Sequence, residues 1–198
     1  MSKVWLGVTG NIGAGKSTVA RFLAKFGAGV VDADAEAHAM ADQDPSYRHA
    51  LMERFGDGLY SVDGKLNRGE LAHRLFGDPI AVSDFNAIVA PRLVQRTRSK
   101  LTKLAETHPV VVLDGALIFE YGRNTDFQEV WLVVAKPEIV IARMKERGYT
   151  DEQIKRRAAA QWSEESKRKL ASRIIENNST PDELELTLRA FWNGLVSK

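Results

Sequence analysis

The sequence has no cysteine, which excludes a disulfide framework and any chemistry at a thiolate. It has no uninterrupted apolar run of about 18 residues, so we expect no membrane-spanning helix and no membrane partner. Its first residues lead straight into a strand-like run without the layout of a signal peptide, and the cytoplasm is therefore the expected compartment. The formal net charge is only +2, which is too small to indicate a nucleic-acid partner.

The sequence does contain enough apolar residues for a core. Hydrophobic residues make up 44% of the 198 positions, and this length favours a single domain. Short apolar runs alternate with helical segments, which predicts an α/β fold with a parallel sheet covered on both faces. The predicted strands are residues 4–8, 29–34, 109–117, 129–135 and 172–177, and the predicted helices include 16–26, 137–147 and a last one after Thr180-Pro181.

Two regions lack convincing strand signals and are predicted to be helical additions to this core. Residues 33–106 read as helices punctuated by turn signals such as "GDP" and "AP", the latter at Ala90-Pro91. Residues 148–169 are dense in charge and have helical propensity.

Residues Gly10–Ser17 fit the phosphate-binding pattern G-x-x-x-x-G-K-[ST]. Glycines let the backbone curl so that successive N–H groups face an anion, and the following helix adds its positive N-terminal end. Lys16 is predicted to reach the β- and γ-phosphates and to act in catalysis, and the Ser17 hydroxyl to hold Mg²⁺. The alternative, an ordinary glycine turn, is disfavoured by the flanking strand and helix. The predicted nucleotide-binding residues are Asn11, Ile12, Gly13, Ala14, Gly15, Lys16, Ser17 and Thr18.

The GTPase strings D-x-x-G and N-K-x-D do not occur in this sequence, so a small P-loop kinase is the natural class. Asp32 and Asp34 lie at the end of the second predicted strand, and ligands of open α/β sheets bind beyond the carboxyl ends of the strands. Asp34 is the predicted catalytic base that accepts a proton from the attacking hydroxyl. A helix N-cap is the alternative for either aspartate.

Several stretches together resemble the dephospho-CoA kinase family over nearly the full length. They are "GVTGNIGAGKSTVA", "VVDADAEAH", "RFGDGLYSVDGKLNRGELAHRLFGD", "LDGALIFE", "IARMKERGYTDEQIKRRAAAQW" and "IIENN". The resemblance implies transfer of the ATP γ-phosphate to the ribose 3′-hydroxyl of dephospho-CoA, the last step of coenzyme A synthesis, with Mg²⁺. It also implies a three-layer P-loop NTPase fold similar to the nucleoside monophosphate kinases, with strand order 2-3-1-4-5.

The same resemblance divides the single domain into functional parts. The core is expected at about residues 1–32, 107–147 and 170–198, the helical substrate-binding part at about 33–106, and a lid at about 148–169. The chain departs from the family at Ala90-Pro91, where the family has His-Pro, and at Asp114-Gly115-Ala116, where it has Asp-Val-Pro. The missing histidine leaves a shifted acceptor or weaker activity open.

Two arginines that precede the expected lid are candidates for charge stabilisation. Arg143 and Arg147 are four residues apart on one predicted helix and should share a face. Arg143 is predicted to be catalytic, by neutralising charge on the γ-phosphate, and Arg147 to bind the nucleotide. A solvated basic helix face is the alternative for both.

Further candidates carry weaker signals. Asp114 ends a strand and could hold Mg²⁺ through water or act as a cap, and Glu120 could orient an arginine or form a structural salt bridge. The resemblance assigns Arg68, Arg92 and Arg96 to CoA binding. The two rival functions are another small-metabolite or nucleoside P-loop kinase, and a nucleotide-binding regulatory protein with reduced turnover. A small-molecule partner is expected, and a monomer is favoured.

Overall fold

The computed structural model describes residues 3–197. The chain divides into two compact units. One comprises the residues up to Asp32 together with those from Lys100 onward, and the other comprises Ala33–Ser99. Among the described residues, no helix has both the length and the hydropathy needed to cross a membrane.

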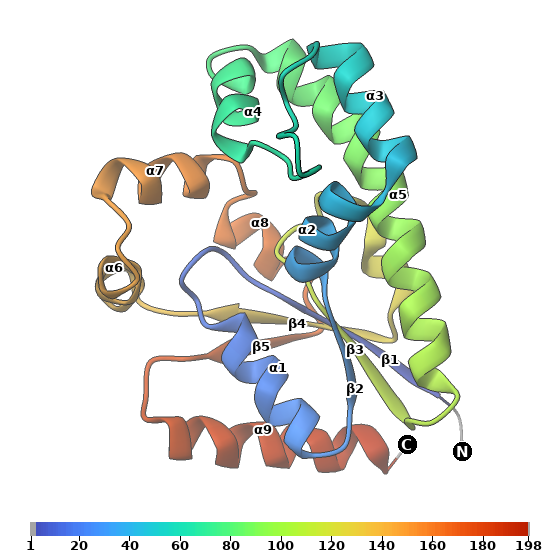
Figure 1. Cartoon of the computed structure of the whole chain (residues 1–198). Helices are drawn as coiled ribbons and strands as arrows, with labels where there is room; N and C mark the ends of the chain where they lie inside the picture. The colour runs from blue at the N-terminus through green and yellow to red at the C-terminus, as the bar shows by residue number, and fades with distance from the viewer. Residues whose placement is uncertain (1–2, 198) are drawn as a thin grey trace. The chain divides into compact units, whose positions relative to one another are not determined.

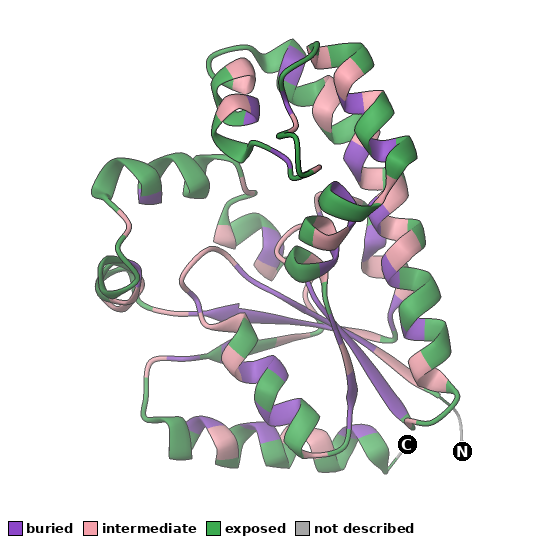
Figure 2. Cartoon of the chain, in the orientation of Figure 1, coloured by how far each residue is buried: buried purple, intermediate pink, exposed green. Residues whose placement is uncertain are grey.

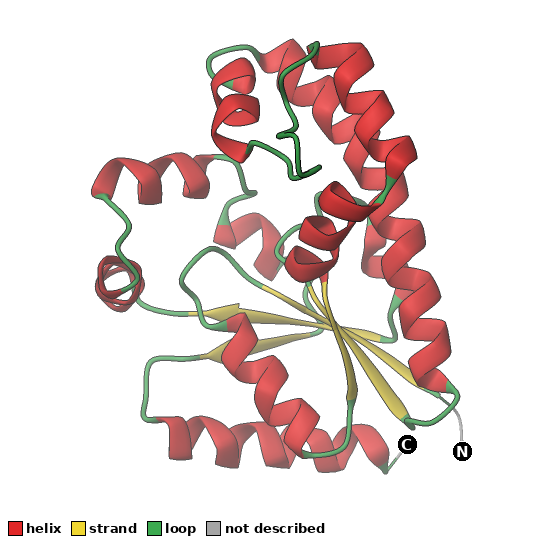
Figure 3. Cartoon of the chain, viewed as in Figure 1, coloured by secondary structure: helices red, strands yellow, loops and turns green. Residues whose placement is uncertain are grey.

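Within the described part of the first unit, five parallel strands form one sheet in the order β2-β3-β1-β4-β5 (Figures 1 and 3). Figure 2 shows that the three central strands, β3, β1 and β4, are buried along most of their length, as parallel strands covered on both faces should be. The fold class and the strand order are those expected from the sequence. The strands are β1 (Val4–Thr9), β2 (Gly29–Asp32), β3 (Val110–Asp114), β4 (Glu129–Val134) and β5 (Arg173–Glu176).

Alternate residues of β1 face two different layers. Leu6 and Val8 join the core cluster that includes α1 (Lys16–Lys25) and α9 (Pro181–Val196), and these helices cover one face of the sheet (Figure 1). On the other face, a Cβ added to Gly7 would lie 3.1 Å from Ile118 Cδ1. The segment between β3 and β4, which contains the 3₁₀ helix η1 (Arg123–Asp126), therefore covers that face.

The remaining helices of the first unit begin where capping rules predict. Proline stands in the first turn of α6 (Pro137–Glu146) and of α9, where its missing N–H costs little. Thr150 and Gln153 form a capping box at the start of α7 (Asp151–Ala159), and the short α8 (Glu164–Arg168) follows it. These boundaries confirm the helices predicted from Pro137 and after Thr180.

The second unit is a small helical assembly. It contains α2 (Ala33–Gln43), α3 (Pro45–Phe55), α4 (Arg68–Leu75) and most of α5 (Pro79–Ala105), which continues into the first unit. Residues 33–99 are all described and contain no strand, only an isolated bridge between Tyr60 and Leu66. Its buried apolar side chains include Met40, Tyr47, Leu51, Leu59, Leu71 and Val89.

The turn expected at Ala90-Pro91 is wrong, because α5 continues through Pro91 without a break in the helix. Proline lacks the N–H that would donate to the carbonyl of Ala87 and usually ends or kinks a helix. Val89 and Leu93 are both buried on either side of the proline. Burial of these side chains keeps the segment helical, since tertiary packing overrides the local preference.

The N-cap of α3 gives a prediction about stability. The Asp44 carboxylate accepts hydrogen bonds from the backbone N–H groups of Ser46 and Tyr47 at 2.9 and 3.2 Å. Asp44→Ala should lower the free energy of unfolding by about 1 kcal/mol in urea denaturation, whereas Asp44→Asn retains an acceptor and should lose less. Equal stability of the wild type and Asp44→Ala would contradict this role.

The same cap should make the stability of the wild type sensitive to acid. The Ser46 hydroxyl, which donates to Asp44, is the largest cause that lowers the pKa of this carboxyl below 3.8. A lowered folded-state pKa stabilises the chain above the unfolded value, and this contribution is lost as the pH falls through the folded value. The difference in stability between wild type and Asp44→Ala should therefore be full at pH 7 and shrink below pH 3.8.

Candidate functional site

The predicted phosphate-binding loop lies between the end of β1 at Thr9 and the start of α1 at Lys16. Two of its glycines are required by both conformation and space. Gly10 has φ +151°, and a Cβ there would lie 2.3 Å from the carbonyl oxygen of Val133. Gly15 has φ +98°, and a Cβ there would lie 2.0 Å from Nδ2 of Asn177. The backbone therefore approaches its neighbours more closely than any side chain would allow.

The end of this loop has the electrostatic character of an anion site. Gly15 is the N-cap of α1 and supplies no side-chain hydrogen bond, and the first turn of α1 contains no acidic residue. The first turn therefore offers no carboxylate of its own to neutralise the N-terminal N–H groups and the positive end of the helix dipole. Such a helix start favours phosphate. The eight residues predicted to bind the nucleotide, from Asn11 to Thr18, all lie on this loop and the first turn of α1.

Two peptide groups of the loop are held by side chains from other elements. The carbonyl oxygen of Ala14 accepts hydrogen bonds from Asn177 Nδ2 at 2.9 Å and from Arg143 Nη1 at 3.3 Å. The N–H of Ile12 donates to Gln161 Oε1 at 3.0 Å. The conformation of the loop therefore depends on α6, on the residue after β5 and on the segment after α7.

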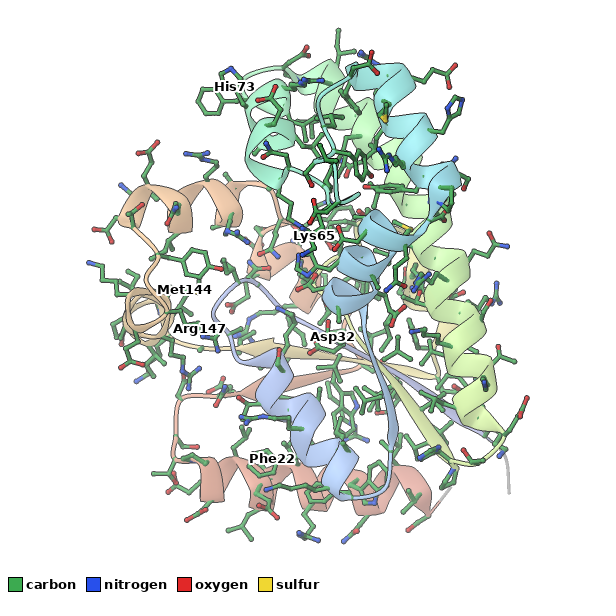
Figure 4. All side chains as sticks on the ribbon, in the orientation of Figure 1. Phe22, Asp32, Lys65, His73, Met144 and Arg147 are labelled. Atoms are coloured by element: carbon green, nitrogen blue, oxygen red, sulfur yellow. The ribbon has the colours of Figure 1, made fainter. Side chains whose placement is uncertain are left out.

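Acidic side chains stand at the same edge of the sheet. Asp32 and Asp114 end neighbouring strands and are register partners, and β3 also pairs with β1, which leads into the loop. Asp32 is exposed whereas Asp114 is buried (Figure 4 labels Asp32). Asp34 lies in the first turn of α2 and belongs to the second unit.

The two candidate arginines have different surroundings. Arg143 is half-buried, and besides its contact with Ala14 it donates from Nη2 to the carbonyl oxygen of Asn177 at 3.1 Å. Arg147 follows the last residue of α6 and is exposed (Figure 4). Among the described residues, the hydrogen bonds join Arg143 to the loop and to Asn177, whereas Arg147 stands at the C-terminal end of α6, which ends at Glu146.

A buried ion pair between Lys167 and Glu120 contacts the segment that connects α7 and α8. Lys167 has 0% exposed side chain, lies 2.8 Å from Glu120 Oε1, and also donates to the carbonyl oxygen of Ala116 at 2.9 Å. Glu120 also accepts from the backbone N–H of Trp162 at 2.9 Å. Trp162 in turn accepts from Asn11 Nδ2 at 3.3 Å. Of the two alternatives for Glu120, the structure has a salt bridge, with a lysine as its partner.

The second unit contains a polar cavity of about 480 Å³, lined by Met40, Asp44, Ser46, Arg92, Gln95, Arg96 and Ser99. Two of the three arginines that the resemblance assigns to CoA binding are therefore at this cavity, and Arg96 also forms an ion pair with Glu36 at 2.8 Å. The third, Arg68, lies 3.6 Å from Asp42 and does not line it.

The described residues contain no cluster of three or more His, Cys, Asp or Glu side chains that could hold a metal ion by themselves. Mg²⁺ does not require such a cluster, because it usually keeps several waters and binds through one or two protein oxygens plus substrate phosphates. Ser17, whose hydroxyl is the expected Mg²⁺ ligand, lies in the first turn of α1, and Asp32 and Asp114 end the strands β2 and β3.

The sequence reasoning missed three residues that hold the site together: Asn177, Gln161 and Lys167. The signals for the first two were present, since both lie in stretches that resemble the family, "IIENN" and "RAAAQW". Their partners are backbone groups more than 140 residues away along the chain, and no local pattern encodes such contacts. Lys167 stands among charged residues and looks solvated in the sequence.

Comparisons with known proteins agree with one another. The family model for dephospho-CoA kinase (CoaE) matches residues 4–183. The dephospho-CoA kinase of Corynebacterium jeikeium is 36% identical over 194 residues, which cover 97% of this chain and 100% of that protein. The crystal structure of TT1252 from Thermus thermophilus has a TM-score of 0.82 at 35% identity and covers 98% of this chain and 99% of that one. Dephospho-CoA kinase from Campylobacter jejuni, 20% identical with a TM-score of 0.65, covers 98% of this chain and 97% of that one, and shares the fold.

The glycine at the start of α1 gives a prediction with a matched control. Gly15→Ala should weaken ATP binding at least about tenfold, because the added Cβ would displace Asn177 and distort the loop, and tenfold corresponds to about 1.4 kcal/mol. Gly27→Ala is the control, since Gly27 has φ +104° but nothing within 4 Å of the added Cβ. Both variants carry the strain of a left-handed alanine, about 1–2 kcal/mol.

Calorimetric titration with ATP and thermal unfolding of both variants separate strain from the local clash. Both melting temperatures should fall, and the ATP dissociation constant should rise for Gly15→Ala alone. If the two variants bind ATP equally well, the contact between Gly15 and Asn177 is irrelevant to the nucleotide.

Proposed function

Since the chain belongs to the dephospho-CoA kinase family, we propose that it transfers the γ-phosphate of ATP to the ribose 3′-hydroxyl of dephospho-CoA and releases ADP and coenzyme A. The observation that carries the proposal is the loop at residues 10–15, which leads directly to the N-terminus of α1, where no side chain forms a capping hydrogen bond. It lies in a chain that matches the family from residue 4 to residue 183.

In this proposal the loop and the first turn of α1 hold the triphosphate. Backbone N–H groups between Asn11 and Thr18 donate to the phosphate oxygens, and Lys16 balances charge on the β- and γ-phosphates. Ser17 would contribute its hydroxyl to Mg²⁺, which would supply positive charge against the negative charge of the phosphates. Lys16 acts mainly in the transition state, where charge on the transferred group is spread over its oxygens.

The acceptor hydroxyl must lose a proton as it attacks phosphorus, and we assign this proton to the Asp34 carboxylate. Support comes from its place just after β2, beyond the carboxyl end of a strand. Asp32 is the alternative base, since it ends that same strand. Arg143 is proposed to stabilise charge on the transferred phosphoryl group, and Arg147 to bind the nucleotide from the end of α6.

The remaining assignments follow the resemblance. The helical residues at about 33–106 are proposed to bind the acceptor, and those at about 148–169 to form the lid. Arg92 and Arg96 at the cavity in the second unit are suited to an anionic part of dephospho-CoA, because guanidinium groups bind phosphate in a bidentate manner. A cytoplasmic location and no binding to nucleic acid remain predictions from the sequence, and a monomer remains the favoured state.

The proposal is tested by coupling ADP release to a spectrophotometric assay across a panel of acceptors that includes dephospho-CoA, nucleosides and shikimate-like alcohols. Turnover should require dephospho-CoA. Ala90 in place of the family histidine makes this panel necessary, because turnover with another acceptor alone would show a shifted substrate. ATP binding without turnover on any acceptor would favour the regulatory alternative.

Lys16→Ala should cut turnover with dephospho-CoA at least about a hundredfold, the scale expected when one main electrostatic contact to the transition state is removed. The melting temperature should stay near that of the wild type, because Lys16 is only half-buried at the start of α1. Near-normal ADP release by this variant would rule out the catalytic role of the loop.

Asp34→Asn keeps the shape of the side chain and removes the base. Turnover should fall roughly 10²–10⁴-fold, the usual range for general-base catalysis, with a much smaller change in the ATP dissociation constant. Asp32→Asn is the matched variant two residues away and should do less damage. If Asp32→Asn is the more damaging, the two roles are exchanged, and if both variants turn over normally, the base lies elsewhere.

A further inference from the structure

The peptide group between Ala14 and Gly15 is held from outside the loop to which it belongs. Its carbonyl oxygen, on the buried Ala14, accepts from Asn177 Nδ2 at 2.9 Å and from Arg143 Nη1 at 3.3 Å. A carbonyl oxygen has two lone pairs, so these two donors satisfy it. The side of the loop on which this oxygen lies is thereby fixed.

Fixing the oxygen also fixes the N–H of Gly15. None of the described peptide bonds is cis, and in a planar trans peptide the N–H and the C=O point in opposite directions. The Gly15 N–H therefore points away from Asn177 and Arg143. A donor at this place, directly before Lys16 and the start of α1, is one of the backbone N–H groups with which such a loop holds a phosphate.

This peptide needs an external restraint because Gly15, one of its two residues, restricts the backbone conformation very little. Gly15 has φ +98° and no side chain, so the backbone here has more accessible conformations than at any other residue type. If the peptide rotated, the carbonyl oxygen of Ala14 would replace the N–H, and a partial negative charge would face the phosphate. Two external hydrogen bonds to that oxygen prevent the rotation.

We propose that Asn177 is a positioning residue for the nucleotide: it fixes the orientation of the Ala14–Gly15 peptide and aligns the Arg143 guanidinium beside it. The role of the bound phosphate in this inference rests on the function proposed above. Asn177 acts through the loop and through Arg143, without itself touching the reacting atoms.

Asn177 is well placed to act as a rigid anchor. It follows β5 directly, its backbone N–H donates to the carbonyl oxygen of Val134 at 2.8 Å, and it is 4% exposed. It also presents two acceptors to Arg143 Nη2, its carbonyl oxygen at 3.1 Å and Oδ1 at 3.4 Å. The same side chain therefore donates to the loop and accepts from the arginine, which requires both halves of an amide.

The simplest rival explanation is that Asn177 only fills space under the loop. The two explanations differ in what the side chain must provide. A space-filling role needs only the size and shape of the side chain, whereas a positioning role needs the N–H donor. Asp has the shape of Asn but lacks this donor, and Ala lacks it without adding charge.

The experiment compares Asn177→Asp and Asn177→Ala with Asn178→Asp. The neighbouring Asn178 is the matched control because its Oδ1 accepts from the backbone N–H of Lys136 at 2.8 Å, and aspartate keeps this acceptor. Both variants at position 177 should raise the ATP dissociation constant about tenfold or more, the scale of one lost hydrogen bond to a buried oxygen. The ATP dissociation constant of the control, Asn178→Asp, should stay within about twofold of the wild-type value.

Two further measurements separate positioning from general damage. The KM for dephospho-CoA at saturating ATP should change less than the KM for ATP, because the inference concerns the phosphate loop alone. In a double-mutant cycle with Arg143→Ala, the losses should be clearly less than additive, because Arg143 depends on Asn177 for its alignment.

Several results would overturn the proposal. They are unchanged ATP affinity in Asn177→Ala, equal losses of affinity for both substrates, strictly additive losses in the cycle, or a failure of both variants to fold, which would make Asn177 purely structural. ATP binding by calorimetry requires no acceptor. Failure of the dephospho-CoA kinase assignment, seen as missing turnover of the wild type, is therefore distinguishable from failure of this inference.

Discussion

A glycine-rich loop that presents its backbone N–H groups to an anion has few side chains of its own to hold them in place, and this constraint organises the first unit. The loop from Gly10 to Gly15 is held instead by contacts and hydrogen bonds with elements that are distant in the sequence. The end of β4 lies against Gly10, and α6 lies against Gly13, where an added Cβ would come within 2.8 Å of Val140. The residue after β5 and the segment after α7 supply hydrogen bonds.

The elements that hold the loop lie close to one another because of the order of the strands in the sheet. In a parallel sheet the carboxyl ends of all strands lie at one edge, and β1 lies at the centre of the order β2-β3-β1-β4-β5. Residues that follow β3, β4 and β5 can therefore reach the loop from both sides although they are far away in sequence. The central position of β1 gives the loop partners that no edge strand would have.

The segment after α7 is fixed much more firmly than α7 itself. In α7 only Ile154 is buried among its described residues, and its ion pair between Arg156 and Glu152 joins exposed side chains, which contributes little stability. Lys167 and Glu120 are buried and hydrogen-bonded, and removal of either partner of such a pair is strongly destabilising. The expected lid thus joins a weakly packed helix to an anchored end, a pattern typical of regions that open locally.

The sequence was sufficient to predict the elements of the first unit, because buried parallel strands are uniformly apolar and the helix starts carry proline or a capping threonine. The strand order came from the family resemblance, since hydrophobic pattern alone does not say which strands are neighbours. The continuation of α5 through Pro91 could not be predicted, because it depends on burial of Val89 and Leu93 in the unit as a whole. The loop residues were recognisable by their motif, whereas Asn177 and Lys167 are defined by contacts that exist only in the folded chain.

Arg143 and Arg147 have different surroundings, and this difference affects how well each could stabilise charge on the transferred phosphoryl group. An arginine loses rotamer freedom when it is ordered, and an exposed one such as Arg147 would lose it upon binding the nucleotide. Arg143 is held by Ala14 and Asn177 in the folded chain, so most of this entropy is lost during folding. A preorganised cation stabilises developing charge without reorganisation at the moment of reaction. The contacts that hold the phosphate loop therefore also favour Arg143 over Arg147 as the arginine that acts in the transition state.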